Sequence, residues 1–114
     1  MAQVLIEGGS IENTFHTQFR FQHETETLAA GKTLTKDSPS LQFLDPGGAG
    51  RTIVLPAEAD SKGLVFFISN EADAAEILTI NDDAAATIVT PTQNEAAILF
   101  CDGTTWSGLV GATS

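Results

Sequence analysis

The side chains best suited to chemistry in this chain are two histidines and one cysteine. His16 and His23 are seven positions apart, so on a β-strand they would point to opposite faces and make a poor pair of metal ligands. Cys101 has no basic residue near it in the sequence to favour a thiolate, which indicates a buried structural thiol and not a nucleophile. These residues predict neither a metal site nor a catalytic group.

Carboxylates are abundant, but no pair of them stands out as a general acid and base. The turn Asn81-Asp82-Asp83 offers oxygen ligands for a hard cation. It lacks the spaced ligands and the closing Glu of an EF-hand loop, and a solvated turn explains it equally well. Phosphate-binding glycine loops, Gly-x-Ser-x-Gly and His-Glu-x-x-His do not occur in the sequence. We expect no enzymatic activity, no catalytic residue and no cofactor.

Trp106 is the only tryptophan and follows an expected turn at Asp102-Gly103. Its indole can close the open end of a small β-rich core, or it can stand outside as a contact for sugar or protein. The first role is favoured because a large aromatic side chain beside a turn buries much apolar area and seals such a core. Trp106 is a possible contact residue only if its side chain is exposed, as in the second role.

The fold that positions these residues is one domain, because the chain has 114 residues. Its net charge of −10 repels the phosphate backbone of nucleic acids. No window approaches the roughly 18 consecutive apolar residues of a membrane span, and the start of the sequence does not read as a secretory signal. We expect no nucleic-acid partner, no membrane association and assembly in the cytoplasm. With one cysteine and no intrachain disulfide, stability often comes from oligomerisation.

Short apolar runs separated by turn clusters indicate strands throughout the chain. Residues 64–68 are apolar at every position, so this strand should be central and covered on both faces. Residues 45–50 should form the most flexible loop, and a short helical turn is expected at 56–60 or 73–76. Residues 28–35 can form one bent strand or two short ones. Further strands are expected at 41–44, 52–55, 77–80, 87–89, 96–101 and 105–110. The pattern predicts an all-β fold, a single small β-sandwich or barrel domain.

The N-terminal segment shows the clearest alternation, with Phe15, Phe19 and Phe21 on one face of a strand over residues 15–24. We therefore expect an extended N-terminal arm or edge strand at residues 1–27 and the β-sandwich domain at residues 28–114. Such an arm can pair with a neighbouring subunit or another surface by strand addition. Alternatively, the three phenylalanines belong to the core of their own domain, and the sequence leaves both interpretations open.

Several strand and turn patterns together suggest a family. They are Thr33-Leu34-Thr35 leading into Leu41-Gln42-Phe43-Leu44-Asp45, then Thr52-Ile53-Val54-Leu55-Pro56, Gly63-Leu64-Val65-Phe66-Phe67-Ile68, Leu78-Thr79-Ile80 and Cys101-Asp102-Gly103-Thr104-Thr105-Trp106. Residues 28–111, which contain them, resemble small β-rich structural modules of tailed bacteriophages, found as head-decoration proteins and as parts of tail fibres. The resemblance implies a structural component of the virion, commonly a homotrimer, without catalytic residues.

The resulting expectation is a capsid decoration, or cement, protein on the capsid surface that binds the major capsid protein and other copies of itself. The candidate contact residues are Val4, Ile6, Phe15, Phe19 and Phe21. One alternative is a tail-fibre or receptor-binding module, in which Trp106 and the loops at 45–50 and 81–83 contact host glycans. A second is a small hydrolase or lyase on a β scaffold, which requires a pocket where several carboxylates or the histidines converge.

Overall fold

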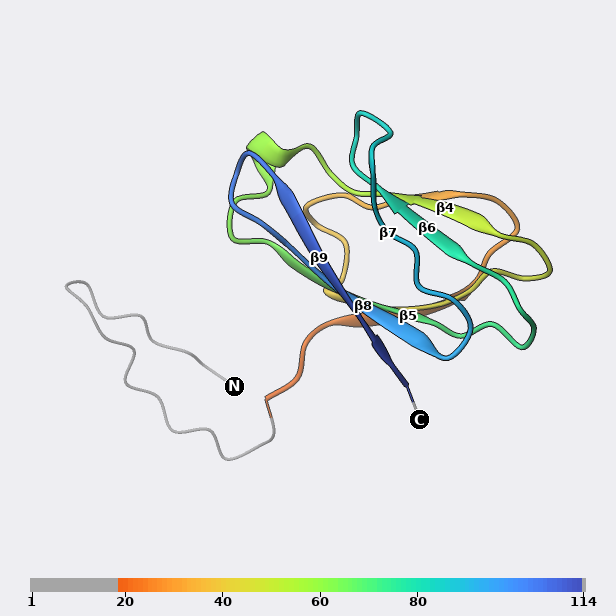
Figure 1. Ribbon diagram of the computed structural model, residues 1–114. Helices are drawn as coiled ribbons and strands as arrows, with labels where there is room; N and C mark the ends of the chain where they lie inside the picture. Colours follow the sequence, from red (N-terminus) through yellow and green to blue (C-terminus); the bar gives the residue numbers. More distant parts are fainter. Residues whose placement is uncertain (1–18, 114) are drawn as a thin grey trace.

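Two β-sheets make up the part of the chain that the computed structural model describes, residues 19–113 (Figure 1). Sheet A has the strand order β1-β3-β5-β8-β9, and sheet B has the order β2-β4-β6-β7. The strands of sheet A are β1 (His23–Thr27), β3 (Leu41–Asp45), β5 (Val65–Asn70), β8 (Glu95–Cys101) and β9 (Trp106–Ala112). Those of sheet B are β2 (Lys32–Thr33), β4 (Arg51–Val54), β6 (Leu78–Asn81) and β7 (Thr87–Val89).

The strand-rich fold expected from the sequence is confirmed for these residues, in which no α-helix occurs. One short 3₁₀-helix, η1 (Glu58–Asp60), lies between β4 and β5, in one of the two segments expected to hold a helical turn. Of residues 28–35, only Lys32 and Thr33 form a strand. Over the described range, no helix is long and apolar enough to cross a membrane.

From β1 to β6 the chain passes back and forth between the two sheets and adds one strand to each in turn. In sheet A, β1, β3 and β5 are parallel neighbours, and in sheet B, β2, β4 and β6 are parallel neighbours. We call each successive pair a rung: β1 with β2, β3 with β4, and β5 with β6. The last three strands run antiparallel to their neighbours, β7 to β6, β8 to β5 and β9 to β8.

The core lies between the two sheets, and strand β5 shows how the sequence builds it. Phe66, Ile68 and Asn70 are buried, whereas the alternate residues Val65 and Phe67 are half-buried on the other face. This is the period of two expected for a strand, and it leaves the second apolar face only partly covered. The rest of the buried cluster comes from both sheets and their loops: Leu28, Leu34, Leu44, Ile53, Leu55, Leu78, Ile80, Ala97, Leu99, Cys101 and Trp106.

The hairpin predicted near the end of the chain is formed by β8 and β9, with Cys101 opposite Trp106. Asp102 shapes its turn, because one carboxylate oxygen accepts the backbone N–H groups of Thr104 and Thr105, each at 2.8 Å. The hydrogen bond from Thr104, followed by that from Thr105, holds the pKa of the Asp102 carboxyl below its ordinary value, because both favour the ionised form. The side chain that follows β8 thus fixes the start of β9.

The loop between β3 and β4, expected to be the most flexible, is tied down by three hydrogen bonds. The Leu28 N–H donates to the Asp45 carbonyl at 2.8 Å, and the Gly47 N–H donates to the Asp45 carboxylate at 2.9 Å. Arg51 Nε donates to the Pro46 carbonyl at 2.8 Å. Gly47 has a φ of 76°, and a Cβ atom there would lie 2.3 Å from the Leu28 carbonyl oxygen. Position 47 therefore requires a glycine because the backbone is closely packed there, and not because the loop is mobile.

At the first rung, charged side chains instead of apolar ones lie at the end of the core. Glu24 and Glu26 lie beside the buried residues Gln42 and Leu44 of β3, so they occupy positions that face the interior of the rung. Lys32 Nζ lies 2.6 Å from a carboxylate oxygen of Glu26 and 3.3 Å from one of Glu24. This ion cluster covers the end of the apolar core at the edge where the parallel sheets stop.

The ion cluster predicts a stability change at alkaline pH. The hydrogen bond to Glu26 is the main reason that the pKa of Lys32 is raised, and desolvation opposes it. Because the folded pKa is above the unfolded one, the stabilisation is fully present below about pH 10.5 and is lost as the pH rises through the folded value. Lys32→Met should lower the melting temperature at pH 8. Above pH 10 the melting temperature of this variant should decrease less steeply than that of the wild type. The same change at the exposed Lys36 is the control, and equal effects at both positions would rule out this role.

Candidate functional site

The outer face of sheet A is apolar across four of its five strands, β3, β5, β8 and β9. His23, Leu41, Phe67, Ile98 and Leu109 pair in register from β1 to β9 and form one row on this face. We define the apolar face as the large apolar residues of β3, β5, β8 and β9 that point away from the core: Leu41, Phe43, Val65, Phe67, Ile98, Phe100 and Leu109.

Part of the apolar face is hollowed into an open groove of about 530 Å³. Among residues 19–113, the lining contains no Asp, Glu, Lys, Arg or His, although the chain is strongly acidic. The polar side chains in the lining are those of Ser69 and Thr113, and the Ser69 hydroxyl donates a hydrogen bond to the Glu71 carboxylate. A groove of this kind buries apolar surface well but has few groups that can orient a small polar ligand.

Two of the residues predicted to contact partners extend the apolar face at the edge formed by β1. The Phe21 ring lies 5.5 Å from that of Phe67, and the Phe19 ring meets Phe21 edge-to-face at 5.3 Å. Phe19 is 68% exposed and Phe21 is 45% exposed, so neither belongs to the buried core.

The remaining expectations for the N-terminal segment divide between the described and undescribed parts of the chain. Val4, Ile6, Phe15 and His16 lie outside the described residues. Residues 23–27, the end of the predicted arm or edge strand, form the edge strand β1, in which His23 is exposed and its ring lies 6.4 Å from that of Phe43.

Trp106 is buried in the core, as its favoured role predicts, so the alternative role as an exposed contact residue is wrong. It is 3% exposed, and its indole Nε1 donates a hydrogen bond to the Pro56 carbonyl at 2.9 Å. Its ring system stacks on Phe66 with the centroids 6.0 Å apart. The indole N–H is therefore satisfied inside the protein, which favours the interpretation that Trp106 seals the core.

Cys101 is buried close to Trp106 in the same hairpin. Its Sγ accepts a hydrogen bond from the Gly103 N–H at 3.4 Å and lies 3.7 Å from the Glu58 carbonyl oxygen. The contacts are those of a structural thiol held between the hairpin turn and η1, as the sequence suggested.

The acidic turn Asn81-Asp82-Asp83 is organised by its own backbone. Asp82 Oδ1 accepts the N–H groups of Ala84 and Ala86 at 2.9 and 2.8 Å, and Ala85 takes a φ of 67°. These bonds use an oxygen that a cation would need, so the geometry is that of a side-chain-supported turn.

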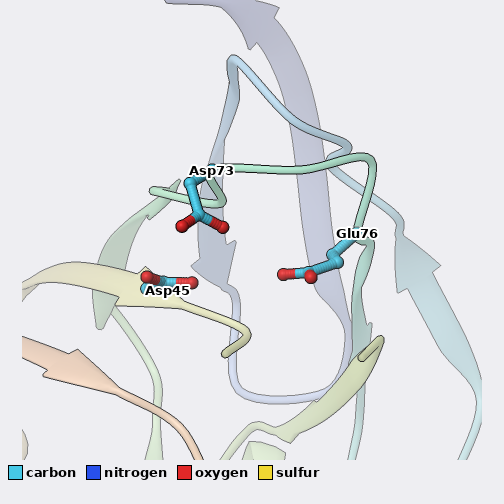
Figure 2. A group of neighbouring side chains, drawn as sticks. All are labelled: Asp45, Asp73 and Glu76. Atoms are coloured by element: carbon cyan, nitrogen blue, oxygen red, sulfur yellow. The ribbon is translucent and has the colours of Figure 1, made fainter. Parts of the chain in front are cut away.

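A different set of carboxylates comes together between β3 and the loop after β5 (Figure 2). Asp45, at the end of β3, faces Asp73 and Glu76 across a small gap, and one oxygen of each lies within 4.8 Å of the others. Buried Asn70 holds this loop in place by donating to the carbonyls of Glu76 and Pro91. Glu76 Oε1 is buried without a hydrogen-bond partner in the structure.

Chemically, these three carboxylates have the oxygen ligands that a hard cation such as Ca²⁺ prefers. Within residues 19–113 they are the one group of three or more such side chains that converge in this way. Exposed acidic groups also gather without a metal, and none of the three lines the apolar groove. The cluster and the apolar face are therefore separate features.

Sequence reasoning missed most of the apolar face because it expected residues 64–68 to be covered on both faces and assigned no face to the residues of the hairpin. A usable signal was present, since β5 and β8 are both apolar at consecutive positions and thus carry two apolar faces. Comparison with known proteins adds no family, because no protein-family model, no curated protein and no solved structure matches the chain.

Proposed function

We propose that this chain is a structural protein of a bacteriophage virion, a decoration protein that binds the assembled head and stabilises it. In this proposal the two sheets form a small β-sandwich that acts through its surface and carries no reacting group. The proposal rests on the resemblance in sequence pattern together with the surface that the fold presents.

One observation carries the proposal: an uncharged, apolar sheet face on a chain with a net charge of −10. Soluble monomers rarely leave large contiguous apolar patches open to water, and such patches mark surfaces that another macromolecule covers. The exposed fractions of Ile98, Phe100 and Leu109 are 42%, 44% and 63%. A partner that buries these side chains gains the free energy of removing their apolar area from water.

The mechanism is passive. A protein that binds only the assembled lattice of major capsid protein stabilises that state by mass action, as any state-specific ligand does. The head then resists the pressure of packaged DNA without a catalytic step. A homotrimer placed where capsid subunits meet satisfies this mechanism.

The alternatives receive less support from the geometry. The tail-fibre interpretation loses Trp106 as a glycan contact, because this side chain is buried. The hydrolase interpretation requires a pocket where carboxylates converge, but the apolar groove has an uncharged lining and the carboxylate cluster lies elsewhere.

Co-sedimentation with capsids tests the proposed function. Purified full-length protein is mixed with undecorated, expanded capsids assembled from the major capsid protein of the same phage. We expect saturable binding and a higher melting temperature of the decorated capsid. A glycan array run in parallel should show no binding. Absence of the protein from the capsid pellet at every concentration, or specific binding to a sugar, would contradict the proposal.

A further inference from the structure

The geometry points to a second copy of this chain as the partner that covers the apolar face of sheet A. This inference rests on the proposed function in one respect, the assignment of a docking role to that face. It adds the identity of the occupant: subunits of the oligomer meet through this face, and other surfaces remain for the capsid.

The distribution of charge is the first argument. Two copies that each carry a net charge of −10 repel one another wherever their acidic residues approach. The described lining of the groove on sheet A contains no charged residue, so repulsion between copies is smallest there. By comparison, the charged cluster of Glu24, Glu26 and Lys32 lies at the open edge of the first rung.

The shape of the face is the second argument. The groove is lined by residues that include Leu41, Phe43 and Phe67. Leu109 in its lining and Phe100 on the same face have exposed apolar side chains. Because hollow and projection lie on the same surface, two copies related by rotation can each place apolar side chains in the hollow of the other. This is the self-complementarity that a two-fold dimer requires, whereas in a ring of three copies each fills the hollow of the next.

The kind of contact is the third argument. A small ligand needs convergent polar groups that fix its orientation, and the lining offers little besides Ser69 and Thr113. A protein surface needs no such groups at the centre of its interface, where apolar and aromatic residues dominate and charged residues are depleted. The lining therefore suits a protein partner better than a small polar molecule.

The size of the face sets the expected strength. Five strands spaced by about 4.8 Å and about 20 Å long span a flat area on the order of 500 Å². Phe19 and Phe21 add to it at the edge formed by β1. A standard interface buries about 800 Å² per partner, so we expect association in the micromolar range.

Sedimentation equilibrium of the full-length chain, from about 1 to about 100 μM, tests the inference. The wild-type chain should form dimers or trimers within this range. Ile98→Lys combined with Leu109→Lys places two charges on the apolar face and should weaken association at least about tenfold, because burying unpaired charges is costly. Circular dichroism and thermal melts establish that each variant is folded.

The matched control is Ile77→Lys combined with Thr52→Lys, which adds the same charge on β4 and at the start of β6. Ile77 is 43% exposed, as Ile98 is 42% exposed, and Thr52 is exposed on sheet B. The control should associate like the wild type. If the lysine pair on sheet A does not fold, Ile98→Thr combined with Leu109→Thr places β-branched side chains, which suit strands, at both positions and should weaken association in the same direction.

A wild-type chain that is monomeric throughout, or two lysine pairs with the same effect, would overturn the inference. Its failure is distinguishable from that of the proposed function. Self-association that depends on sheet A without capsid binding removes the decoration role alone. Capsid binding by a monomer, abolished by the lysine pair on sheet A, assigns the face to the capsid and refutes the second copy.

Discussion

Replacing Phe66 with alanine should lower the free energy of unfolding by about 3–5 kcal/mol, the range for large aromatic truncations in a packed core. Phe66 is 0% exposed and stacks on Trp106, whose indole is fixed by its hydrogen bond to Pro56. Removing the ring leaves a cavity beside the only tryptophan of the chain. Urea unfolding followed by tryptophan fluorescence measures the change directly.

Phe67→Ala is the matched control, because it makes the same truncation at the next residue on the opposite face of β5. Phe67 is half-buried on the apolar face, so its loss should cost only about 1 kcal/mol in the dilute, unassociated protein. Equal losses for the two variants would show that the inner and outer faces of β5 are assigned incorrectly.

Replacing Gly47 with alanine should cost at least about 2 kcal/mol, since strain and steric overlap add at this position. Its φ of 76° disfavours any side chain, and the new Cβ would lie 2.3 Å from the Leu28 carbonyl oxygen. Relief requires the backbone to move, which weakens the hydrogen bond from the Leu28 N–H to the Asp45 carbonyl at the end of the β1 and β3 pair. Thermal unfolding monitored by circular dichroism measures this loss.

Gly48→Ala separates the two causes. Gly48 also has a positive φ, 105°, but an added Cβ would meet nothing within 4 Å. Its cost should therefore be that of backbone strain alone, about 1 kcal/mol. A Gly48 variant as unstable as the Gly47 variant would mean that the contact with Leu28 is unimportant.

Most of the strands from β3 onward were predictable because they are short, largely apolar runs between turn residues, whereas β1 and β2 contain no apolar residue. The segment expected at 87–89 is β7 (Thr87–Val89), and the one expected at 41–44 is β3 (Leu41–Asp45). Their parallel order was not predictable. This order depends on pairing between segments that are distant in the sequence. The rungs also differ in length, because the stretch of chain from His23 to its partner Leu41 is shorter than the stretch from Leu41 to its partner Phe67. Unequal rungs leave no fixed repeat in the sequence.

The candidate site was predictable only at its edge. The alternation around Phe19 and Phe21 predicted a strand with one aromatic face, and it left open whether that face is exposed or part of the core. In the structure residues 19–22 form no strand, because β1 begins at His23, and both rings are exposed beside the apolar face. Ile98 and Leu109 were read only as parts of a hairpin, because hydrophobicity alone does not say which side of a strand faces the core. The cluster of Asp45 with Asp73 and Glu76 was also hidden, since Asp45 is distant from the other two in sequence.

The most direct test of the account is the reactivity of a thiol placed on the apolar face. Ile98→Cys and, separately, Ile77→Cys are made in a Cys101→Ser background, and maleimide labelling rates are measured over a range of protein concentrations. The account predicts that the thiol at position 98 becomes protected as concentration rises while the thiol at position 77 stays reactive. Equal and concentration-independent rates at both positions, including after mixing with capsids, would contradict the claim that this face works by being covered.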